Sequence, residues 1–322
     1  MSVQDATSFA AIQPTLVSDQ MFLTATALNN IPMLRTCLNM SQNSQGAISL
    51  KFPSHPAFSS AQSVTVGTAL TATAATLGSK TLTKSTNRAI YEEGANTERA
   101  NNNQDDLPAK LAQATGILLT TIETALGALY TGAGISRDAG LNDIAEADIQ
   151  YLVEQFDAVN APDDRRVLVL SPTQCSAVRK NPRFSQADSI GSGSSLITGA
   201  IGSILGFQVM RSNCLTSTGG QRQCLAYVAA PTALYDARQM GYGQTGTAPE
   251  GSRGMVGDCS ISYAIAQVPA PYNPGILSFP APFGRVTISY RAAAAANEFR
   301  ADALYGVLNH KTEWTAVIKT NP

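Results

Sequence analysis

The clearest run of hydrophobic positions in the chain is Val167–Leu170, four apolar residues bounded by polar ones. A short apolar run of this kind, rich in β-formers, predicts a strand that is buried on both faces. Ser171 follows as a helix cap, with Pro172 at the first helical position and Gln174 three residues after the cap. These residues predict a helix that runs to about Lys180 and stops before the next proline.

Two longer helices are predicted earlier in the chain. Between Asp105 and Gly132, apolar and small residues recur at helical spacing. They are Leu111, Thr115, Leu118, Ile122, Ala125 and Leu129. The acidic start and Pro108 fit a helix N-terminus, and about 24 residues at 1.5 Å each give a length of roughly 36 Å. A second helix is expected from Ala145 to Val159, with inward positions at Ile149, Leu152, Val153 and Phe156.

The stretch Ala61–Glu93 predicts a long β-hairpin made mostly of Thr and Ala. Its expected pieces, in order, are the limb Ser63–Val66 with Thr71–Thr73, the turn Gly78-Ser79, and the limb Lys80–Lys84 with Arg88–Tyr91. A lone two-stranded hairpin is marginal in water, and these limbs carry few large apolar side chains. The hairpin therefore needs another surface, which is either its own chain or a neighbouring molecule.

Ahead of the hairpin, Met1–His55 is polar and predicts an arm. It contains a short helix capped by Ser18-Asp19, with Phe22 on its apolar side, and an alternating strand at Gly46–Pro53. A segment with so little apolar content cannot bury itself, so it lies on another surface or is disordered.

Extended segments dominate the second half of the chain. Strands are expected at Phe207–Met210, Gln223–Ala229, Ser260–Val268, Arg285–Arg291, Phe299–Leu308 and Trp314–Lys319. Between them we expect a short helix at Pro231–Gln239 and irregular segments at Gln186–Ser195, Met240–Asp258 and Pro269–Gly284. The alanines of 292–296 either extend a strand or nucleate a helix.

The order of these elements resembles that of a known family. Arg165–Phe184 reads RRVLVLSPTQCSAVRKNPRF, and Leu196–Asn213 reads LITGAIGSILGFQVMRSN, with Gly206, Phe207 and Val209 in its last part. Together they resemble the major capsid proteins of tailed double-stranded DNA bacteriophages, which have the Hong Kong 97-type fold. The resemblance implies an α+β fold with an N-terminal arm, an extended β-hairpin loop, a peripheral domain with a long spine helix, and a central axial domain.

The same resemblance divides the chain into five segments. They are the N-terminal arm at 1–55, the extended hairpin loop at 56–104, the peripheral domain with its spine helix at 105–160, the axial domain at 161–284, and the return strands of the peripheral domain at 285–322.

Composition agrees with a surface that is largely covered by neighbours. Charged residues make up 14% of the 322 residues, against about 25% in ordinary proteins, and interface centres are depleted of charge. A low-charge soluble protein would have the same composition. The net charge is −1 and no Lys/Arg block exceeds two residues, which excludes the basic footprint of a nucleic-acid reader. No secretory signal and no run of about 18 apolar residues occur, so we expect a soluble protein made in the cytoplasm.

The sequence offers little material for catalysis. It contains no GxSxG elbow, P-loop or HExxH motif, and the glycines at 199, 202 and 206 do not match a dinucleotide loop. Only two histidines occur, and no CxxC pair. We therefore predict no catalytic residue, no cofactor and no metal, and free buried thiols at Cys37, Cys175, Cys214, Cys224 and Cys259.

The resemblance implies a structural protein and not an enzyme. It would be a major capsid subunit that self-assembles through pentamers and hexamers into an icosahedral phage head around double-stranded DNA, in the cytoplasm of a bacterial host. Portal, scaffold and cement proteins are further expected partners, contact with DNA is non-specific, and no membrane is involved. The expected assembly contacts are Phe22, Val64, Val66, Lys80, Leu82, Lys84 and Tyr91.

Two alternatives stay open. One is an encapsulin-like nanocompartment shell with the same fold, which would enclose a cargo enzyme instead of DNA. The other is a soluble enzyme or binding domain whose site carries no recognisable motif.

Overall fold

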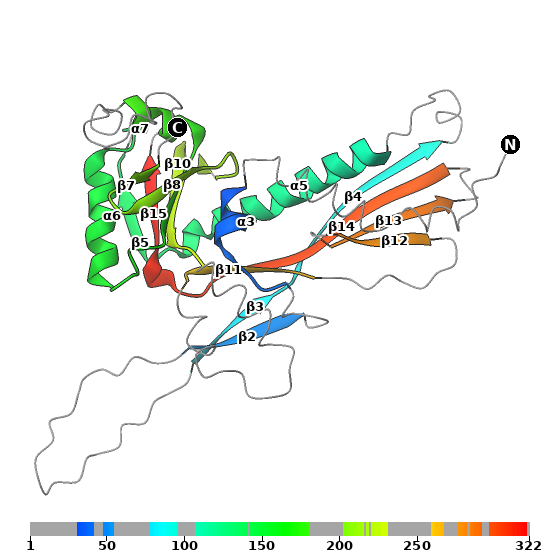
Figure 1. The fold of residues 1–322 in the computed structure, drawn as a ribbon, viewed down its shortest axis with the longest axis horizontal. Helices are drawn as coiled ribbons and strands as arrows, with labels where there is room; N and C mark the ends of the chain where they lie inside the picture. Colours follow the sequence, from blue (N-terminus) through cyan, green and yellow to red (C-terminus); the bar gives the residue numbers. More distant parts are fainter. Residues whose placement is uncertain are drawn as a thin grey trace, which may run out of the picture.

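The computed structural model describes residues 31–41, 48–54, 78–95, 107–140, 142–180, 202–215, 217–218, 220–230, 259–266, 276–281, 284–291 and 296–320. These residues form two large β-sheets, a separate two-stranded hairpin that projects from the body, and four α-helices (Figure 1). The helices are α3 Pro32–Thr36, α5 Leu107–Gly127, α6 Glu146–Ala158 and α7 Pro172–Lys180. The predicted α+β class is confirmed, as are the spine helix and the helix that follows Ser171.

The first sheet has seven strands in the order β5-β15-β10-β6-β8-β7, and β9 pairs with β10. Their bounds are β5 Ile135–Asp138, β6 Arg166–Leu170, β7 Ser203–Ile204, β8 Phe207–Arg211, β9 Ser217–Thr218, β10 Gln221–Val228 and β15 Thr315–Thr320. Strand β6 lies in the interior of the sheet and is buried along its whole length, as the apolar run at Val167–Leu170 predicts.

Alternate residues of β6 pack on opposite faces of this sheet, because successive side chains of a strand point to opposite sides. Leu168 and Leu170 join a buried cluster with Phe156 of α6 and with residues of α7. Val167 and Val169 join a different cluster that includes α5 and α3. The seven-stranded sheet is therefore covered by α6 and α7 on one side and by the α3–α5 pair on the other.

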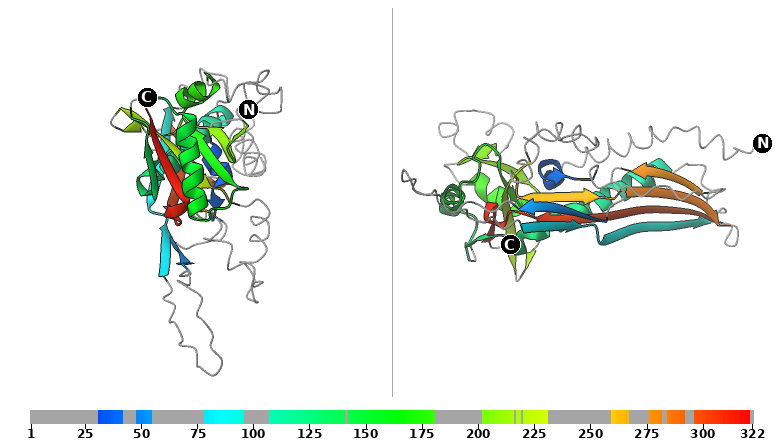
Figure 2. Two further views of the ribbon diagram at one scale, coloured as in Figure 1. Left: turned by 90° about the vertical axis from the view of Figure 1, so that its left-hand side faces the viewer. Right: turned by 90° about the horizontal axis from the view of Figure 1, so that it is seen from below.

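The second sheet has six strands in the order β1-β11-β14-β13-β12, with β4 also paired to β14. Their bounds are β1 Leu38–Asn39, β4 Thr86–Ala95, β11 Ile261–Ile265, β12 Ile276–Ala281, β13 Gly284–Arg291 and β14 Ala296–Asn309. Helix α5 runs alongside this elongated sheet, as the views in Figure 2 show. The strands predicted at Arg285–Arg291 and Phe299–Leu308 are confirmed as parts of β13 and β14.

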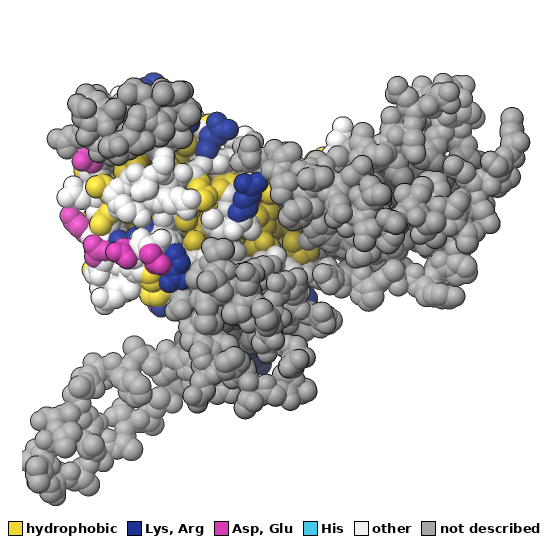
Figure 3. Space-filling view, in the orientation of Figure 1, with side chains coloured by type: hydrophobic (Ala, Val, Ile, Leu, Met, Phe, Trp, Pro, Cys, Tyr) yellow, Lys and Arg dark blue, Asp and Glu magenta, His cyan; other side chains and the backbone are white. Residues whose placement is uncertain are grey.

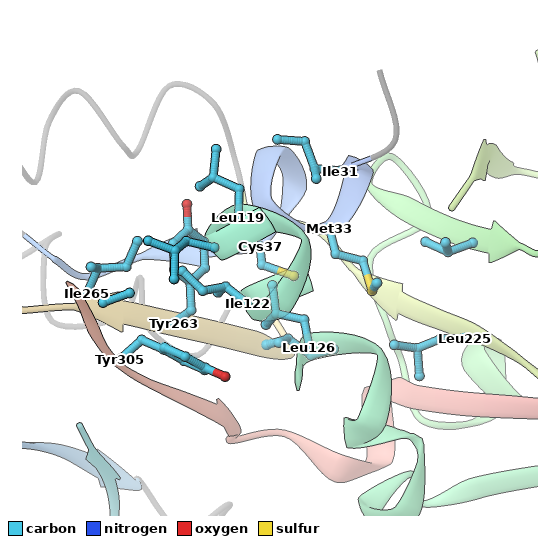
Figure 4. Close-up of a cluster of buried hydrophobic side chains, with 14 of the residues drawn as sticks. Ile31, Met33, Cys37, Leu119, Ile122, Leu126, Leu225, Tyr263, Ile265 and Tyr305 are labelled. Atoms are coloured by element: carbon cyan, nitrogen blue, oxygen red, sulfur yellow. The ribbon is translucent and has the colours of Figure 1, made fainter. Parts of the chain in front are cut away.

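The two sheets meet at one large buried cluster, which we call the central core (Figure 4). Its members come from α3, α5, β6, β10, β11 and β14. They include Met33, Leu118, Ile122, Leu126, Val167, Leu225, Tyr227, Tyr263 and Tyr305. The apolar residues of α5 therefore pack against both sheets. This contact with both sheets is what we expect of the predicted spine helix.

The hairpin differs from its prediction in its first strand. Strand β3 (Gly78–Thr83) pairs with β2 (Ser49–Ser54), and Gly78 lies opposite Ser54 inside the ladder. The predicted turn at Gly78-Ser79 is therefore wrong, and the predicted limb at 63–73 lies outside the described residues. The alternating strand expected at Gly46–Pro53 was assigned to the N-terminal arm, and the structure places β2 there as the partner of β3. The alternation of a strand does not reveal its partner, because pairing depends on the surface that the strand meets.

In the structure, three elements pack with a different sheet from the one that the expected division into five segments implies. Helix α6, expected in the peripheral domain, and β15, expected among its return strands, both belong to the seven-stranded sheet and its core. Strand β11, expected in the axial domain, belongs to the six-stranded sheet. Local patterns indicate the type of an element, but its partner is chosen by long-range contacts.

The proline-rich stretch before residue 284 contains a strand that the sequence did not predict. Strand β12 includes Pro280 and pairs with β13 at the edge of the six-stranded sheet. An edge strand tolerates a proline because one side of its backbone has no ladder bond to donate. Ala296, which the sequence left open between strand and helix, is the first residue of β14.

Replacing Ser171 with alanine should lower the free energy of unfolding by about 1 kcal/mol. The Ser171 hydroxyl accepts a hydrogen bond from the backbone N–H of Gln174 at 3.3 Å, so the substitution leaves this N–H of α7 without its cap. Urea unfolding measures the change. The matched control is Ser176→Ala, in an exposed position of the same helix, and an equal loss in both variants would contradict the capping role.

Candidate functional site

The base of the hairpin is fixed firmly to the body of the subunit. Leu82 of β3 has no exposed surface and lies in a small apolar cluster. The other buried members of this cluster are Leu38, Met40, Cys259 and Ala264. A hydrogen bond adds to this anchor, because Lys80 Nζ donates to the carbonyl of His310 at 2.6 Å. The Lys84 N–H donates to the carbonyl of Ile48 at 2.8 Å, which joins the two limbs of the hairpin to each other.

Strand β14 passes the bend between β3 and β4 in backbone contact. A Cβ placed on Gly306 would lie 2.8 Å from the carbonyl carbon of Thr83 and 3.1 Å from the backbone nitrogen of Lys84. Side-chain carbons do not approach backbone atoms as closely as 2.8 Å, so only glycine fits here. The angle at which the hairpin leaves the body is therefore set by the crossing at Gly306.

Beyond this anchor, the described part of the hairpin is open to solvent. Its exposed residues are Ile48, Ser49, Lys51, Ser79, Thr81 and Thr83. Ile48 is 68% exposed, and Tyr91, on β4 just after the hairpin, is 52% exposed. Each of these side chains would remove apolar surface from water if another molecule covered it.

The outer face of α5 is a second surface without charge. Ile117 is 58% exposed, and the other exposed positions between 113 and 128 are Gln, Thr or Ala. The hydroxyls of Thr120 and Thr124 donate to the carbonyls four residues earlier, at 2.6 and 2.8 Å. Since these donors are satisfied within the helix, the face could be covered by a neighbour without leaving them unpaired.

Charge is unevenly distributed over the subunit. On the face drawn in Figure 3, acidic side chains gather over α6, whereas hydrophobic side chains gather toward the middle of the molecule. Such a distribution suits an arrangement in which the middle of the subunit is covered and the α6 end stays in water.

The structure places the predicted assembly residues in three different situations. Leu82 is fully buried and Lys84 is 4% exposed within the subunit, so neither side chain is open to a neighbour in the way that the expected assembly contacts require. Leu82 instead packs in the apolar cluster at the hairpin base. Lys80 is half-buried and contributes to the same anchor, while Tyr91 is on the surface as expected. Phe22, Val64 and Val66 lie outside the described residues.

Among the described residues, three large apolar side chains that are exposed were missed by the sequence reasoning: Ile48, Ile117 and Leu205. For Ile117 a signal existed: it lies off the helical spacing that carries Leu118 and Ile122 inward, so a large apolar residue stands on the solvent side. For Ile48 the alternation of its strand gave no such signal, because the side that faces the body depends on the pairing with β3.

The described residues hold little that could act as a chemical site. All five cysteines are free and buried, which confirms the predicted free thiols. Burial raises the pKa of Cys175 and Cys214, and it raises the pKa of Cys224 to about 12, so these thiols stay protonated and unreactive near neutral pH. Within the described ranges, no three His, Cys, Asp or Glu side chains lie close enough to bind a metal ion.

None of the helices in the described part of the chain has the length and the hydropathy needed to cross a membrane.

Comparison with known proteins gives matches among solved structures alone. No protein-family model and no curated protein matches the sequence. The capsid of the cyanophage P-SCSP1u shares 12% identity at a TM-score of 0.63, covering 92% of this chain and 90% of that one. A structure of Mycobacterium phage Che8 shares 16% identity at a TM-score of 0.59, covering 84% of both chains. The capsid of an empty GTA particle shares 12% identity at 0.57, covering 91% and 90%. The chain therefore has the fold of phage capsid proteins of the Hong Kong 97 type, as the resemblance in its sequence predicted.

Proposed function

We propose that this protein is a major capsid subunit, which self-assembles through pentamers and hexamers into an icosahedral phage head that encloses double-stranded DNA. Its role is structural and not catalytic. The fold shared with capsid chains over most of their length supports this assignment. The observation that carries it is the hairpin β2–β3, which has an anchored base and an exposed outer part.

The hairpin is built to be completed by another molecule. Strands β2 and β3 form a sheet of their own and pair with no other described strand. A two-stranded sheet alone is marginally stable in water, and an apolar residue such as Ile48 gains stability only when a neighbour covers it. A copy of the same subunit is the natural neighbour, because in a closed shell each copy offers the same surfaces to the next.

Shell stability would then come from many modest contacts, each formed only on assembly. The hairpin, Tyr91 on β4 and the uncharged face of α5 supply such contacts. With a net charge of −1 the subunit does not neutralise DNA, so contact with a packaged genome would be loose and non-specific. In this proposal the protein resides in the virion capsid after assembly in the bacterial cytoplasm, with portal, scaffold and cement proteins as further partners.

The five segments expected from the sequence are kept as part of the proposal, with changes taken from the packing. The peripheral domain would consist of α5 and the six-stranded sheet, and the axial domain of the seven-stranded sheet with α6 and α7. The hairpin loop would include β2. With this division, the two sheets could change their relative angle at the central core. Such changes would let the same subunit occupy different positions in the shell.

Size-exclusion chromatography of the purified protein, followed by negative-stain microscopy, tests the proposal. We expect an excluded fraction that contains closed polyhedral shells, or rings of five and six subunits, because the exposed outer part of the hairpin gains stability when a neighbour covers it. A protein that stays monomeric at high concentration, with a hairpin that resists proteases, would contradict a capsid role and favour a soluble enzyme or binding domain.

The content of the shells separates a phage head from a nanocompartment of the same fold. Shells isolated from the native source should contain DNA that survives nuclease treatment and is released on disruption. Shells that hold a single enzyme and no DNA would support the nanocompartment and overturn the phage assignment, while leaving the structural role intact.

A further inference from the structure

The turn between β7 and β8 has an unusual backbone conformation at Leu205. Ile204 pairs with Phe207, so Leu205 and Gly206 are the two central residues of a two-residue hairpin turn. Their φ angles are 47° and 84°, and a type I′ turn requires positive values at both positions. Glycine adopts this conformation freely, whereas the Cβ of leucine comes too close to the backbone. The strain at Leu205 lowers the folding equilibrium constant by a factor of roughly 5 to 30.

The residues on either side of the turn are buried, and they fix its position. Phe207 has no exposed surface, and its ring meets the ring of Phe156 on α6 edge to face, with 5.4 Å between the ring centroids. Ile204 lies opposite Phe207 in the ladder, is 7% exposed and belongs to the same cluster of buried residues. Because both limbs are held in this way, a strained residue can persist between them.

Leu205 is also poorly buried. It is 46% exposed, so about half of the stabilisation that a buried leucine provides is not realised within the subunit. The other non-glycine residue with a left-handed φ in the described ranges is Asn160, and asparagine tolerates this conformation. A bulky apolar residue in a position that is both strained and exposed points to a role other than the stability of the subunit.

The surroundings of Leu205 suit contact with an identical surface. No charged residue occurs between Ser203 and Met210. Gly206 and Gln208 are exposed beside the leucine, and a Cβ placed on Gly206 would have no atom within 4 Å. An apolar side chain therefore stands next to open space on an uncharged patch. A second copy of this patch would bring no like charge against it, whereas a charged patch would repel its own copies.

We propose that the turn at Leu205 is a contact between subunits, in which its side chain packs against the same turn of a second copy. The inference rests on the proposed capsid function, because copies placed around a rotation axis present the same patch to one another. Free subunits would carry both the strain and the exposed leucine, and assembly would remove the side chain from water. The contact accounts for a leucine where asparagine or glycine would form the turn more easily.

Replacing Leu205 with asparagine separates a contact between subunits from a role in folding. Asparagine favours the turn but removes the apolar side chain, so relief of the strain opposes loss of the buried half of the leucine. For the isolated subunit, urea unfolding should give a folding equilibrium constant between the wild-type value and about 10 times that value. The protein concentration needed for assembly, measured by light scattering, should nevertheless rise about 3- to 10-fold. A variant that loses stability and assembly together, or one that assembles like the wild type, would overturn the contact.

Leu205→Met is the matched control, because it keeps an apolar side chain of similar volume in the same turn. It should stay within about 3-fold of the wild type in both assays. A Leu205→Met protein that assembles as poorly as Leu205→Asn would show that apolar packing is not what the turn contributes, and would overturn the proposal.

Leu205→Cys tests which surface the turn meets. The five native cysteines are free and buried, so the introduced thiol is the accessible one. A disulfide needs Cβ atoms about 3.5–4.5 Å apart, so mild oxidation with copper phenanthroline should join chains through position 205 in shells but not in dilute subunits. Ser176→Cys, at an exposed position of α7, should give no such pairs. Shells of Leu205→Cys without the crosslink would overturn the turn-to-turn contact.

The outcome for the wild type separates this contact from the proposed function. Wild-type protein that forms neither shells nor rings would contradict the capsid role and this contact together. Shells that form equally well from the wild type and from Leu205→Asn would contradict the contact alone.

Discussion

Replacing Gly306 with alanine is expected to destabilise the subunit by about 3 kcal/mol and to prevent shell formation. The new methyl group would meet the backbone of Thr83 and Lys84, which cannot move aside as a flexible side chain can. Either β14 or the bend between β3 and β4 must shift, and the hairpin would then leave the body at a different angle. Urea unfolding measures the stability, and size-exclusion chromatography measures assembly.

Gly202 provides the control for this prediction. It is exposed, its φ is not in the left-handed region, and no atom lies within 4 Å of a Cβ placed on it, so Gly202→Ala should change stability by less than about 0.5 kcal/mol. If Gly306→Ala and Gly202→Ala assemble equally well, the close crossing does not set the hairpin angle, and the account of the anchor is wrong.

Leu82→Ala and Tyr91→Ala should have opposite effects on stability and assembly. Leu82 has no exposed surface, so its truncation leaves a cavity at the hairpin base and should lower the free energy of unfolding by about 2–5 kcal/mol. Tyr91 is 52% exposed, so its truncation should change the stability of the isolated subunit by less than about 1 kcal/mol. Tyr91→Ala should nevertheless raise the protein concentration needed for shells, because a neighbour covers this ring in the proposed assembly.

Both variants are measured in the same two assays, urea unfolding of isolated subunits and light scattering during assembly. A Leu82→Ala protein of wild-type stability would show that the small cluster around Leu82 does not hold the hairpin. A Tyr91→Ala protein that assembles like the wild type would remove Tyr91 from the assembly contacts and leave Ile48 and Ile117 as the next positions to test.

Elements with strong local signals could be predicted from the sequence. Val167–Leu170 lies in the interior of a sheet, so both faces of the strand are apolar and the run is continuous. Ser171 caps α7 through its own side chain, which is a purely local interaction. The helical spacing of Leu118 and Ile122 indicated the buried face of α5, because this spacing is also a local feature of the sequence.

Partners and exposure could not be predicted in the same way. Leu82 and Tyr91 both lie in alternating β-segments, yet one is buried by β1 and β11 of its own chain and the other faces solvent. The difference is decided by residues that are far away in the sequence. Glu123 of α5 gave no signal either, because a single carboxylate among apolar helix positions does not reveal that the backbone N–H groups of α3 will meet it.

The strand pairing also orders events during synthesis of the chain. Strand β15 lies between β5 and β10 in the seven-stranded sheet, and Ile135 pairs with Ala316. Leu38 likewise pairs with Ser262 in the other sheet. At ordinary translation rates, roughly 10 to 40 seconds separate the two strands of the first pair. Neither sheet can close while the ribosome is still translating the middle of the chain, so a nascent subunit cannot present finished surfaces to its neighbours. Polysomes would then carry incomplete subunits side by side without assembling them, and each copy would become competent only after β15 has been added to its sheet.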